Sequence, residues 1–349
     1  MTVLLRPGRG TTLVRGDKLT RGVESAVPLG NIGDPTAGWG DMFSVAVLIP
    51  CHNEAAAIAK VVADFHAALP QARIFVYDNN STDDTQAAAR DAGAVVRTEA
   101  LQGKGHVVRR MFADVEADVF VLVDGDDTYA AAVVPEMLRL MLDRQLDMVT
   151  AVRASQQEAA FRRGHLLGNA VLTGLVRRIF GNRVSDMLSG YRVFSRRFVK
   201  SFPALAVGFE TETEFTVHAL ELKMPIGEVV TAYRGRPPGS TSKLRTYADG
   251  VHILRSIVLL VKEERPLQFF ALIGALLLLT GFGVGLPVVV EFLRIGLVPR
   301  LPTAVLATGF VLMAFLSFVC GLVLDTVTHG RREMRRLAYL AIPGVAARL

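Results

Sequence analysis

The chain has 349 residues, 51% of them hydrophobic, and a formal net charge of +6. This length allows one sizeable α/β domain and a further part, and the hydrophobic share indicates that the further part lies in a membrane. The two cysteines, Cys51 and Cys320, fall in a predicted cytoplasmic loop and a predicted membrane helix, which excludes a disulfide-stapled secreted domain.

The chain starts with a segment that contains glycine and arginine but no apolar core. We therefore predict a loose N-terminal arm over residues 1–43 and no cleavable signal peptide. From Ser44 onward, short apolar runs alternate with helical segments, which predicts a mostly parallel sheet. The predicted strands span 45–49, 73–77, 94–97, 119–123 and 147–151, and the predicted helices span 54–68, 83–92, 104–116 and 131–144.

The second half of this α/β domain, predicted over 44–243, has a looser pattern. We predict a basic helix over 161–180, a strand within 185–194, a helix over 210–223 and a strand over 226–233, followed by a loop to Lys243. Apolar residues then recur at helical spacing, which predicts an interfacial helix over 244–265 that leads into the membrane.

Two uncharged runs follow, within the predicted membrane region 266–326. They cover 267–290 and 302–324, and at 1.5 Å per residue each spans about 35 Å, enough to cross a hydrocarbon core of about 30 Å. Arginine and lysine flank the outer ends of the pair, so the positive-inside rule places both termini in the cytoplasm. The alternative is a pair of buried helices in a soluble core.

The tail, residues 327–349, carries arginines at helical spacing beside apolar residues. These arginines are Arg331, Arg332, Arg335 and Arg336. The pattern predicts a basic cytoplasmic helix that lies on anionic lipid headgroups. In the first membrane run, small residues permit close contacts with neighbouring helices and hence a homo-oligomer. They are Gly274, Gly281, Gly283 and Gly285.

Three polar clusters follow predicted strands, where parallel sheets bind ligands. Asp124-Gly125-Asp126 offers carboxylates that can hold a hard divalent cation, Mg²⁺ or Mn²⁺, although Asp and Gly are also ordinary turn formers. Asp78 ends a strand and can accept hydrogen bonds from a base or a ribose. The turn around Lys104 opens a helix with amides and an ammonium that suit phosphate.

In their order, these segments resemble inverting glycosyltransferase family 2, and within it the polyprenyl-phosphate group that includes dolichol-phosphate mannose synthase. The matching segments are Ile49-Pro-Cys-His-Asn-Glu54, Asp78-Asn-Asn-Ser-Thr-Asp-Asp-Thr85, Gly103-Lys-Gly105, Asp124-Gly-Asp126, Ser189-Gly-Tyr-Arg192 and Ser242-Lys243. The resemblance implies a GT-A (Rossmann-like) fold. It also implies transfer of a sugar from a nucleotide-sugar to polyprenyl phosphate, with a metal-bound diphosphate and no nucleic acid partner.

The resemblance further implies roles for individual residues. Asp124 and Asp126 would hold the metal, and Arg153, Arg163 and Arg192 would complete the catalytic set. Residues near the nucleotide-sugar would be Pro50, Asn53, Glu54, Asp78, Asn80, Lys104, Gly125, Arg196 and Lys243. The acceptor phosphate would contact Arg153, Arg163 and Asn169, although some relatives have a serine where this chain has Leu167.

Two other functions are compatible with parts of the pattern. A processive polysaccharide synthase would carry a Gln-x-x-Arg-Trp motif, but the single tryptophan, Trp39, precedes the domain. A non-catalytic scaffold or sensor would keep the nucleotide-binding sheet and lose the metal carboxylates, which are present here. We therefore expect an enzyme at the cytoplasmic membrane, with a UDP-sugar favoured over GDP-mannose as the donor.

Overall fold

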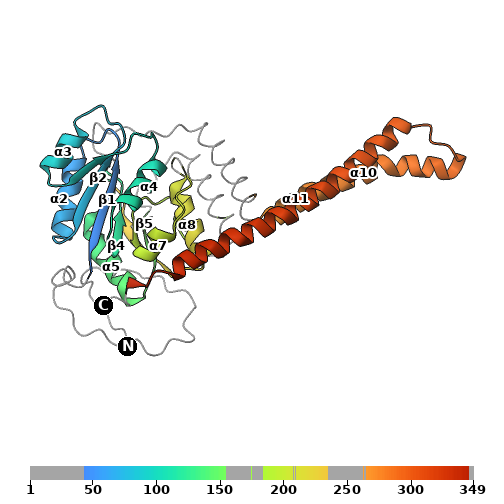
Figure 1. Ribbon diagram of the computed structural model, residues 1–349. Helices are drawn as coiled ribbons and strands as arrows, with labels where there is room; N and C mark the ends of the chain where they lie inside the picture. Colours follow the sequence, from blue (N-terminus) through green and yellow to red (C-terminus); the bar gives the residue numbers. More distant parts are fainter. Residues whose placement is uncertain are drawn as a thin grey trace, which may run out of the picture.

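The structure is a computed structural model that describes residues 43–154, 184–206, 210–234 and 265–345, with the single positions 174, 208 and 262. A sheet with helices on both faces is followed by two long helices that extend far from it (Figure 1). The predicted arm, basic helix, 234–243 loop and interfacial helix lie almost wholly outside the described residues.

The described part of the chain has a seven-stranded sheet in the order β3-β2-β1-β4-β6-β5-β7. Its strands are β1 Val45–Cys51, β2 Arg73–Asp78, β3 Val95–Thr98, β4 Val119–Leu122, β5 Met148–Ala154, β6 Arg192–Ser195 and β7 Ile226–Ala232. All neighbouring strands are parallel except β6, which runs antiparallel to β4 and β5. The predicted mostly parallel α/β sheet is thus confirmed.

Helices cover both faces of the sheet (Figure 1). They are α2 Ile58–Ala68, α3 Thr85–Asp91, α4 Lys104–Asp114, α5 Val134–Asp143, α7 Arg196–Ser201 and α8 Thr211–Glu221. Alternate strand residues face opposite sides, so Val47 and Ile49 join the core with α2 and α5. Leu48 joins the other core, with α4, α7 and α8. This alternation explains why every central strand is apolar throughout.

The order of strands reverses between β1 and β4. The chain first moves outward from β1 to β2 and β3, and then returns to place β4 on the other side of β1. At such a switch point, the loops at the carboxyl ends of the two strands separate and leave a crevice for a ligand. The loops that follow Cys51 and Leu122 begin at this position.

Two helices, α10 Pro266–Ile295 and α11 Leu301–Leu340, form an antiparallel hairpin. Each contains a highly apolar window that is long enough to cross a membrane, and only 11% and 17% of these windows are buried. A soluble core helix would be mostly buried, so the core-helix alternative is wrong for this pair. The two apolar C-terminal helices of the sequence prediction are confirmed.

The small residues of α10 pack against α11 of the same chain. A side chain at Gly274 would lie 3.1 Å from the Ala314 carbonyl oxygen, and one at Gly281 would lie 3.3 Å from that of Ala307. Ser317 Oγ also donates to the Phe270 carbonyl oxygen at 2.9 Å. Gly274 and Gly281 are therefore needed within the hairpin, and a homo-oligomer through α10 stays a prediction.

The tail differs from the sequence prediction. It continues the second apolar run in one unbroken helix of 40 residues, and its end lies against the sheet domain. Arg332 and Arg335 pair with Glu221 of α8. These two arginines thus bind protein instead of lipid headgroups. They lie on one face of α11, and that face meets Glu221 at the end of α8.

His218 of α8 is a buried titratable group whose effect on stability can be measured. Its Nε2 lies 3.1 Å from Ser201 Oγ, and burial, with a smaller effect of Arg335, lowers its pKa from 6.5 to about 3. The unfolded chain binds this proton near pH 6.5 and the folded protein does not. Stability from His218 is therefore present above that pH and is lost as the pH falls toward 3.

We expect the pH profile of unfolding to change when this group is removed. Between about pH 7 and pH 4, the neutral His218 should cost the wild type about 3 kcal/mol of folding free energy. The His218→Gln protein should lose less thermal stability over the same range, as measured by its unfolding midpoint in detergent. Parallel pH profiles for the two proteins would contradict the buried neutral histidine.

Candidate active site

The loops after β1 and β2 are bound to each other at the carboxyl edge of the sheet. Asn53 adopts φ 54°, in the left-handed region that asparagine tolerates. Its amide donates to Ser81 Oγ at 2.8 Å, and its Oδ1 accepts from the Thr82 amide at 2.8 Å. The amide of Glu54, which is buried, donates to Thr85 Oγ1 at 2.9 Å. Pro50 lies in β1 beside Tyr77 of β2, at the base of these loops.

Asn80 extends this arrangement to the loop after β3. It also has a left-handed backbone, with φ 60°, and its Nδ2 donates to the Ala100 carbonyl oxygen at 2.9 Å and lies 3.1 Å from Gln102 Oε1. The loops after β1, β2 and β3 therefore form one connected rim. The structure brings the predicted residues Pro50, Asn53, Glu54, Asp78 and Asn80 together along this rim.

Asp78 is buried at the base of the rim, with 1% of its surface exposed. Its Oδ2 accepts from Gln86 Nε2 at 2.9 Å and from the Ser81 amide at 3.2 Å. Its Oδ1 is buried and has no hydrogen-bond partner among the described residues. A buried carboxylate oxygen without a donor is costly, so this atom is suited to accept a hydrogen bond from a ligand.

A three-charge cluster lies between β4 and α8. Lys104, the first residue of α4, places its Nζ 2.5 Å from Asp124 Oδ1 and 2.5 Å from Glu212 Oε1. Burial alone would lower the pKa of Lys104, but the two carboxylates outweigh it and raise that pKa. The cluster holds two negative charges and one positive charge, so it retains a net attraction for a further cation.

Asp126 lies two residues beyond Asp124 and is almost fully buried, with 5% of its surface exposed. Its Oδ1 accepts from Thr128 Oγ1 at 2.6 Å and from the Thr128 amide at 3.3 Å. The intervening Gly125 has no room for a side chain, because a Cβ there would lie 2.5 Å from Cys51 Sγ. The turn between the two carboxylates is thus packed closely against the end of β1.

The donor set fits a hard divalent cation that a ligand also coordinates. Asp124 offers a partly exposed carboxylate that already contacts a cationic ammonium, and Asp126 offers a second carboxylate nearby in the chain. No group of three or more His, Cys, Asp or Glu side chains in the described ranges is arranged to hold a metal ion alone. A cation bound here would therefore need oxygen ligands from a substrate, as diphosphate oxygens would provide.

Arg153 lies at the carboxyl end of β5, on the same edge as Asp124. Its guanidinium makes a two-point contact with Asp186, with Nε to Oδ2 at 2.7 Å and Nη2 to Oδ1 at 2.9 Å. It also lies 5.4 Å from the centre of the Tyr233 ring. Burial would lower the pKa of Arg153, but the hydrogen bond and charge of Asp186, together with Tyr129 and Tyr233, outweigh it and raise the pKa. The guanidinium is therefore fixed and charged.

Arg192 begins β6 at the end of the strand nearest Asp124, and its side chain is enclosed by the protein. Its exposed fraction is 0%, and it donates to Thr216 Oγ1 at 2.8 Å and to the Met187 carbonyl oxygen at 2.6 Å. Burial lowers the pKa of Arg192 to about 10, which leaves it cationic at neutral pH. Its hydrogen bond to Thr216 ties β6 to α8, and its predicted catalytic role stays a prediction.

Arg196 lies at the wrong edge of the sheet for a contact with the diphosphate. Because β6 is antiparallel to β4, Arg192 pairs with Leu122 near Asp124, whereas Ser195 pairs with Val119 at the opposite end. Arg196 follows Ser195, and its Nη2 lies 3.2 Å from Glu116. Arg163, Asn169 and Lys243 lie outside the described residues, so their predicted roles stay predictions.

Comparisons with known proteins place this site in a family. The profile of glycosyl transferase family 2 matches residues 46–202. The glycosyltransferase AglJ of Haloferax volcanii is 30% identical over 299 residues, which cover 85% of this chain and 98% of that protein. This chain belongs to glycosyl transferase family 2. It is therefore a glycosyltransferase, as the order of its motifs predicted.

Two further comparisons concern a relative and the fold. The dolichyl-phosphate hexose transferase of Haloferax volcanii is 29% identical over 221 residues, 63% of this chain and 95% of that protein. Glucosyl-3-phosphoglycerate synthase of Mycobacterium tuberculosis, solved with Mn²⁺, UDP-glucose and phosphoglyceric acid, has a TM-score of 0.52 and 21% identity. The match covers 64% of this chain and 79% of that one. The likeness to this solved structure shows that the present chain has the GT-A fold.

Sequence reasoning missed two residues of the site. Glu212 is one of three glutamates at alternate positions, with Glu210 and Glu214, and nothing local in the sequence shows which of them faces the crevice. The structure shows that Glu212 contacts Lys104, whereas Glu214 accepts from the amides of the preceding loop. Tyr129 was also missed. Its hydroxyl accepts a hydrogen bond from the Gly190 amide at 3.1 Å, and the two residues are too far apart in the sequence for a local pattern to reveal the contact.

Proposed function

We propose that this glycosyltransferase transfers a sugar, with inversion, from a nucleotide-sugar to the phosphate of a polyprenyl lipid. One observation carries the proposal. The chain that folds into the family 2 domain also ends in the apolar α10–α11 hairpin, so the site is attached to the phase in which a prenyl lipid resides. The relative named a dolichyl-phosphate hexose transferase supports a lipid phosphate as the acceptor.

The chemistry needs no dedicated general base. A lipid phosphate is already anionic at neutral pH, since its second pKa is about 6. In a single displacement, a phosphate oxygen forms a bond to the anomeric carbon while the bond from that carbon to the diphosphate oxygen breaks. The nucleoside diphosphate leaves with the electron pair. The acceptor therefore adds without releasing a proton.

The residues of the site divide this task. Asp78 accepts from the nucleoside through its unpartnered Oδ1, and Lys104 contributes positive charge for the diphosphate. Asp124 and Asp126 would hold Mg²⁺ or Mn²⁺, which when bound neutralises the diphosphate leaving group. Arg153, together with Arg163 and Asn169, would bring the acceptor phosphate to the anomeric carbon.

The arrangement of charged residues around the hairpin supports a cytoplasmic active site. Arg265 precedes α10, and four arginines, at 331, 332, 335 and 336, follow the apolar part of α11, whereas the segment between the apolar runs carries two, Arg294 and Arg300, the second of which lies near Glu291. By the positive-inside rule, both termini and the catalytic domain lie in the cytoplasm. The product would then be a lipid-linked sugar made on the cytoplasmic face, for use in cell-envelope glycans.

The two rival functions meet specific obstacles. A scaffold or sensor would not require the Lys104, Asp124 and Glu212 cluster, which is costly to bury without a ligand role. A processive synthase would require its acceptor motif with tryptophan, and the sequence has only Trp39. Both rivals predict that no lipid-linked monosaccharide is formed.

A product assay tests the proposal. The purified protein receives undecaprenyl phosphate, Mg²⁺ or Mn²⁺, and a panel of UDP-sugars and GDP-mannose, with UDP-sugars favoured. Release of the nucleoside diphosphate is measured, and lipids are identified by mass. We expect one donor to give a sugar-phosphoryl-prenyl lipid. Metal-dependent nucleotide binding with no lipid product from any donor would favour the sensor, and a polymer would favour the synthase.

The role of Asp78 makes a separate prediction. In the Asp78→Asn protein, the side-chain oxygen must keep the bonds to Gln86 and Ser81, so the new amide group faces the ligand and repels its donor. Losing a hydrogen bond to a charged acceptor costs about 1.5–3 kcal/mol, so we expect the donor KM to rise about tenfold or more. The turnover at saturating donor should change little.

The matched control is Asp84→Asn, which removes the same charge from an exposed residue of the same loop. The control protein should keep the donor KM of the wild type. Measurement of donor binding by calorimetry separates affinity from turnover. A donor KM in Asp78→Asn equal to that of Asp84→Asn would show that Asp78 does not contact the nucleoside.

A further inference from the structure

Helix α11 is longer than a membrane span requires. Its 40 residues extend about 60 Å, whereas about 20 residues cross the hydrocarbon core. The apolar part ends at Leu324, and residues 325–340, which we call the strut, continue as the same helix to the catalytic domain (Figure 1). The membrane hairpin and the domain are thus joined by continuous helix at this point.

The strut is attached to the domain by charged groups on one of its faces. Arg332 Nε lies 3.0 Å from Glu221 Oε1, and Arg335 Nη1 lies 2.6 Å from Glu221 Oε2. The Glu221 side chain is 3% exposed, so these two cations are its counter-charges in a nearly dry environment. Positions 332, 335 and 339 follow helical spacing, which places all three side chains against the domain.

The third contact of this face is Tyr339. Its hydroxyl donates to Asp147 Oδ2 at 2.8 Å, and the Arg197 guanidinium lies 4.8 Å from the centre of its ring. Asp147 is fully buried and also accepts from Arg197 and from Ser195. We call Arg332, Arg335 and Tyr339, together with Glu221 and Asp147, the joint.

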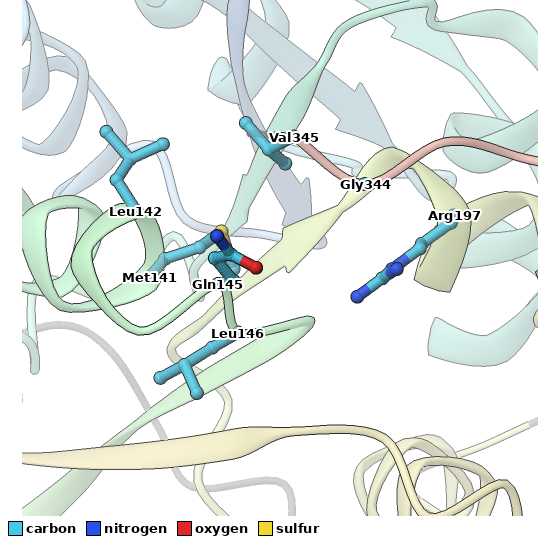
Figure 2. Close-up of a pocket in the computed structure, with 7 residues that line it drawn as sticks. All are labelled: Met141, Leu142, Gln145, Leu146, Arg197, Gly344 and Val345. Atoms are coloured by element: carbon cyan, nitrogen blue, oxygen red, sulfur yellow. The ribbon is translucent and has the colours of Figure 1, made fainter. Parts of the chain in front are cut away.

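The chain remains on the domain after the joint. Gly344 and Val345 lie beside the end of α5 and Arg197 and line a pocket there (Figure 2). Val345 packs against the core beneath α5. The attachment therefore extends beyond the strut, along the edge of the sheet from which the strands β1, β4 and β5 start.

The joint lies at the opposite edge of the sheet from the active site, yet it holds two elements that reach the site. Asp147 directly precedes β5, whose other end carries Arg153. Glu221 ends α8, whose first turn carries Glu212, the partner of Lys104. Neither Glu221 nor Asp147 can touch a substrate at Asp124, so any effect of the joint acts through position.

We propose that the joint is a positioning device. It fixes the catalytic domain on the membrane hairpin, so that the active site stands at one height and orientation above the bilayer, where the phosphate of a membrane lipid can reach Arg153. This rests on the proposed lipid-phosphate acceptor. A displacement of about 1 Å between reacting groups can cost about a hundredfold in rate, so a loose domain would lose turnover with membrane-held acceptors.

The test uses the full-length protein with charge reversals. In Arg332→Glu/Arg335→Glu, two carboxylates meet Glu221 and force the joint open. In the matched control, Arg331→Glu/Arg336→Glu, the same charges are reversed at exposed positions of the same turns. Adding Glu221→Arg to the first variant restores opposite charges across the joint. Each protein is assayed with undecaprenyl phosphate in vesicles of phosphatidylethanolamine and phosphatidylglycerol, and with citronellyl phosphate, a short soluble acceptor, in detergent.

We expect the opened joint to lower turnover on the vesicle acceptor by about tenfold or more and on the soluble acceptor by less than about threefold. The control should keep the wild-type ratio of the two rates, and Glu221→Arg should restore it. Equal losses on both acceptors would show structural damage only and overturn the proposal. If the control lost as much turnover on the vesicle acceptor as the opened joint, the tail arginines would act by binding lipid headgroups. That result would also overturn the proposal.

A measurement without catalysis separates this proposal from the proposed function. A dye is attached at Gln71→Cys, in an exposed turn of the domain, in a Cys320→Ser background, and energy transfer to dye-labelled lipids reports its height above the bilayer. We expect one narrow height in the wild type and the control, and a broad distribution in the opened joint. Unchanged heights would overturn the proposal. A wild type inactive on both acceptors would overturn the proposed function alone.

Discussion

Replacing Asp126 with asparagine should lower turnover by about a thousandfold while the protein stays folded. The asparagine oxygen can still accept from Thr128, so the turn after β4 is kept. The negative charge is lost from a nearly dry site, where a carboxylate that binds a cation contributes several kcal/mol to the stabilisation of a leaving diphosphate. A loss of about 4 kcal/mol corresponds to about a thousandfold in rate.

The measurement is turnover at saturating donor and acceptor, together with the affinity for Mn²⁺ in the presence of the nucleoside diphosphate. The matched control is Asp127→Asn, the next residue, whose Oδ1 pairs with Lys60 at the surface 2.8 Å away. It has a left-handed backbone, φ 55°, that asparagine also tolerates. The control should stay within about twofold of wild type, since a surface ion pair contributes little. Full activity in Asp126→Asn would remove Asp126 from the mechanism.

The sequence was sufficient for the central parallel strands β1, β2 and β4 because they are buried on both faces. A strand such as β1 is then apolar throughout and is followed by turn residues, and both signals are local. The same local logic placed Asn53, Asp78 and Asp124 at strand ends. Because parallel strands share their carboxyl edge, strand order was not needed to predict that these residues lie at one edge of the sheet.

The antiparallel strand β6 could not be predicted in this way. Its direction reverses which end of the strand lies near the site, so Arg192 and Arg196 exchange the places that a parallel strand would give them. Nothing local in Arg192-Val-Phe-Ser195 specifies that direction. The helix α7, which starts directly after this strand, was also missed, because it is short and has no separating turn.

Ion pairs between residues far apart in the chain also could not be predicted from the sequence. Lys104 and Glu212 are 108 residues apart, and Arg335 and Glu221 are 114 residues apart. Taken alone, each of these charged residues is typical of a solvent-exposed position. The tail arginines therefore indicated a lipid surface, and only the packing of α11 on α8 shows that two of the four are bound by protein.

Gly190 provides the second large prediction, because it limits where Asp124 can lie. A Cβ at Gly190 would be 2.2 Å from Asp124 Oδ2 and 2.8 Å from its Cγ, closer than any real Cβ contact. The Gly190 backbone cannot easily retreat, since its amide donates to the buried Tyr129 hydroxyl. The colliding group is the end of a side chain, so in Gly190→Ala the Asp124 carboxylate should move and the fold should survive.

We expect Gly190→Ala to lower turnover by about a hundredfold, because the carboxylate would leave its contact with Lys104 and the position from which it meets a cation. Gly283→Ala is the control, since a Cβ there meets nothing within 4 Å. Gly125→Ala gives the contrast, because its Cβ would meet the buried Cys51 and should lower the unfolding midpoint as well.

A double-mutant cycle decides whether the effect passes through Asp124. If Gly190→Ala acts only by displacing that carboxylate, it should cause little further loss in an Asp124→Ala background, where no carboxylate remains to be displaced. Additive losses would mean that the new methyl group disturbs the crevice in another way. Non-additive losses would show that Gly190, by having no side chain, allows the Asp124 carboxylate to take the position that catalysis needs.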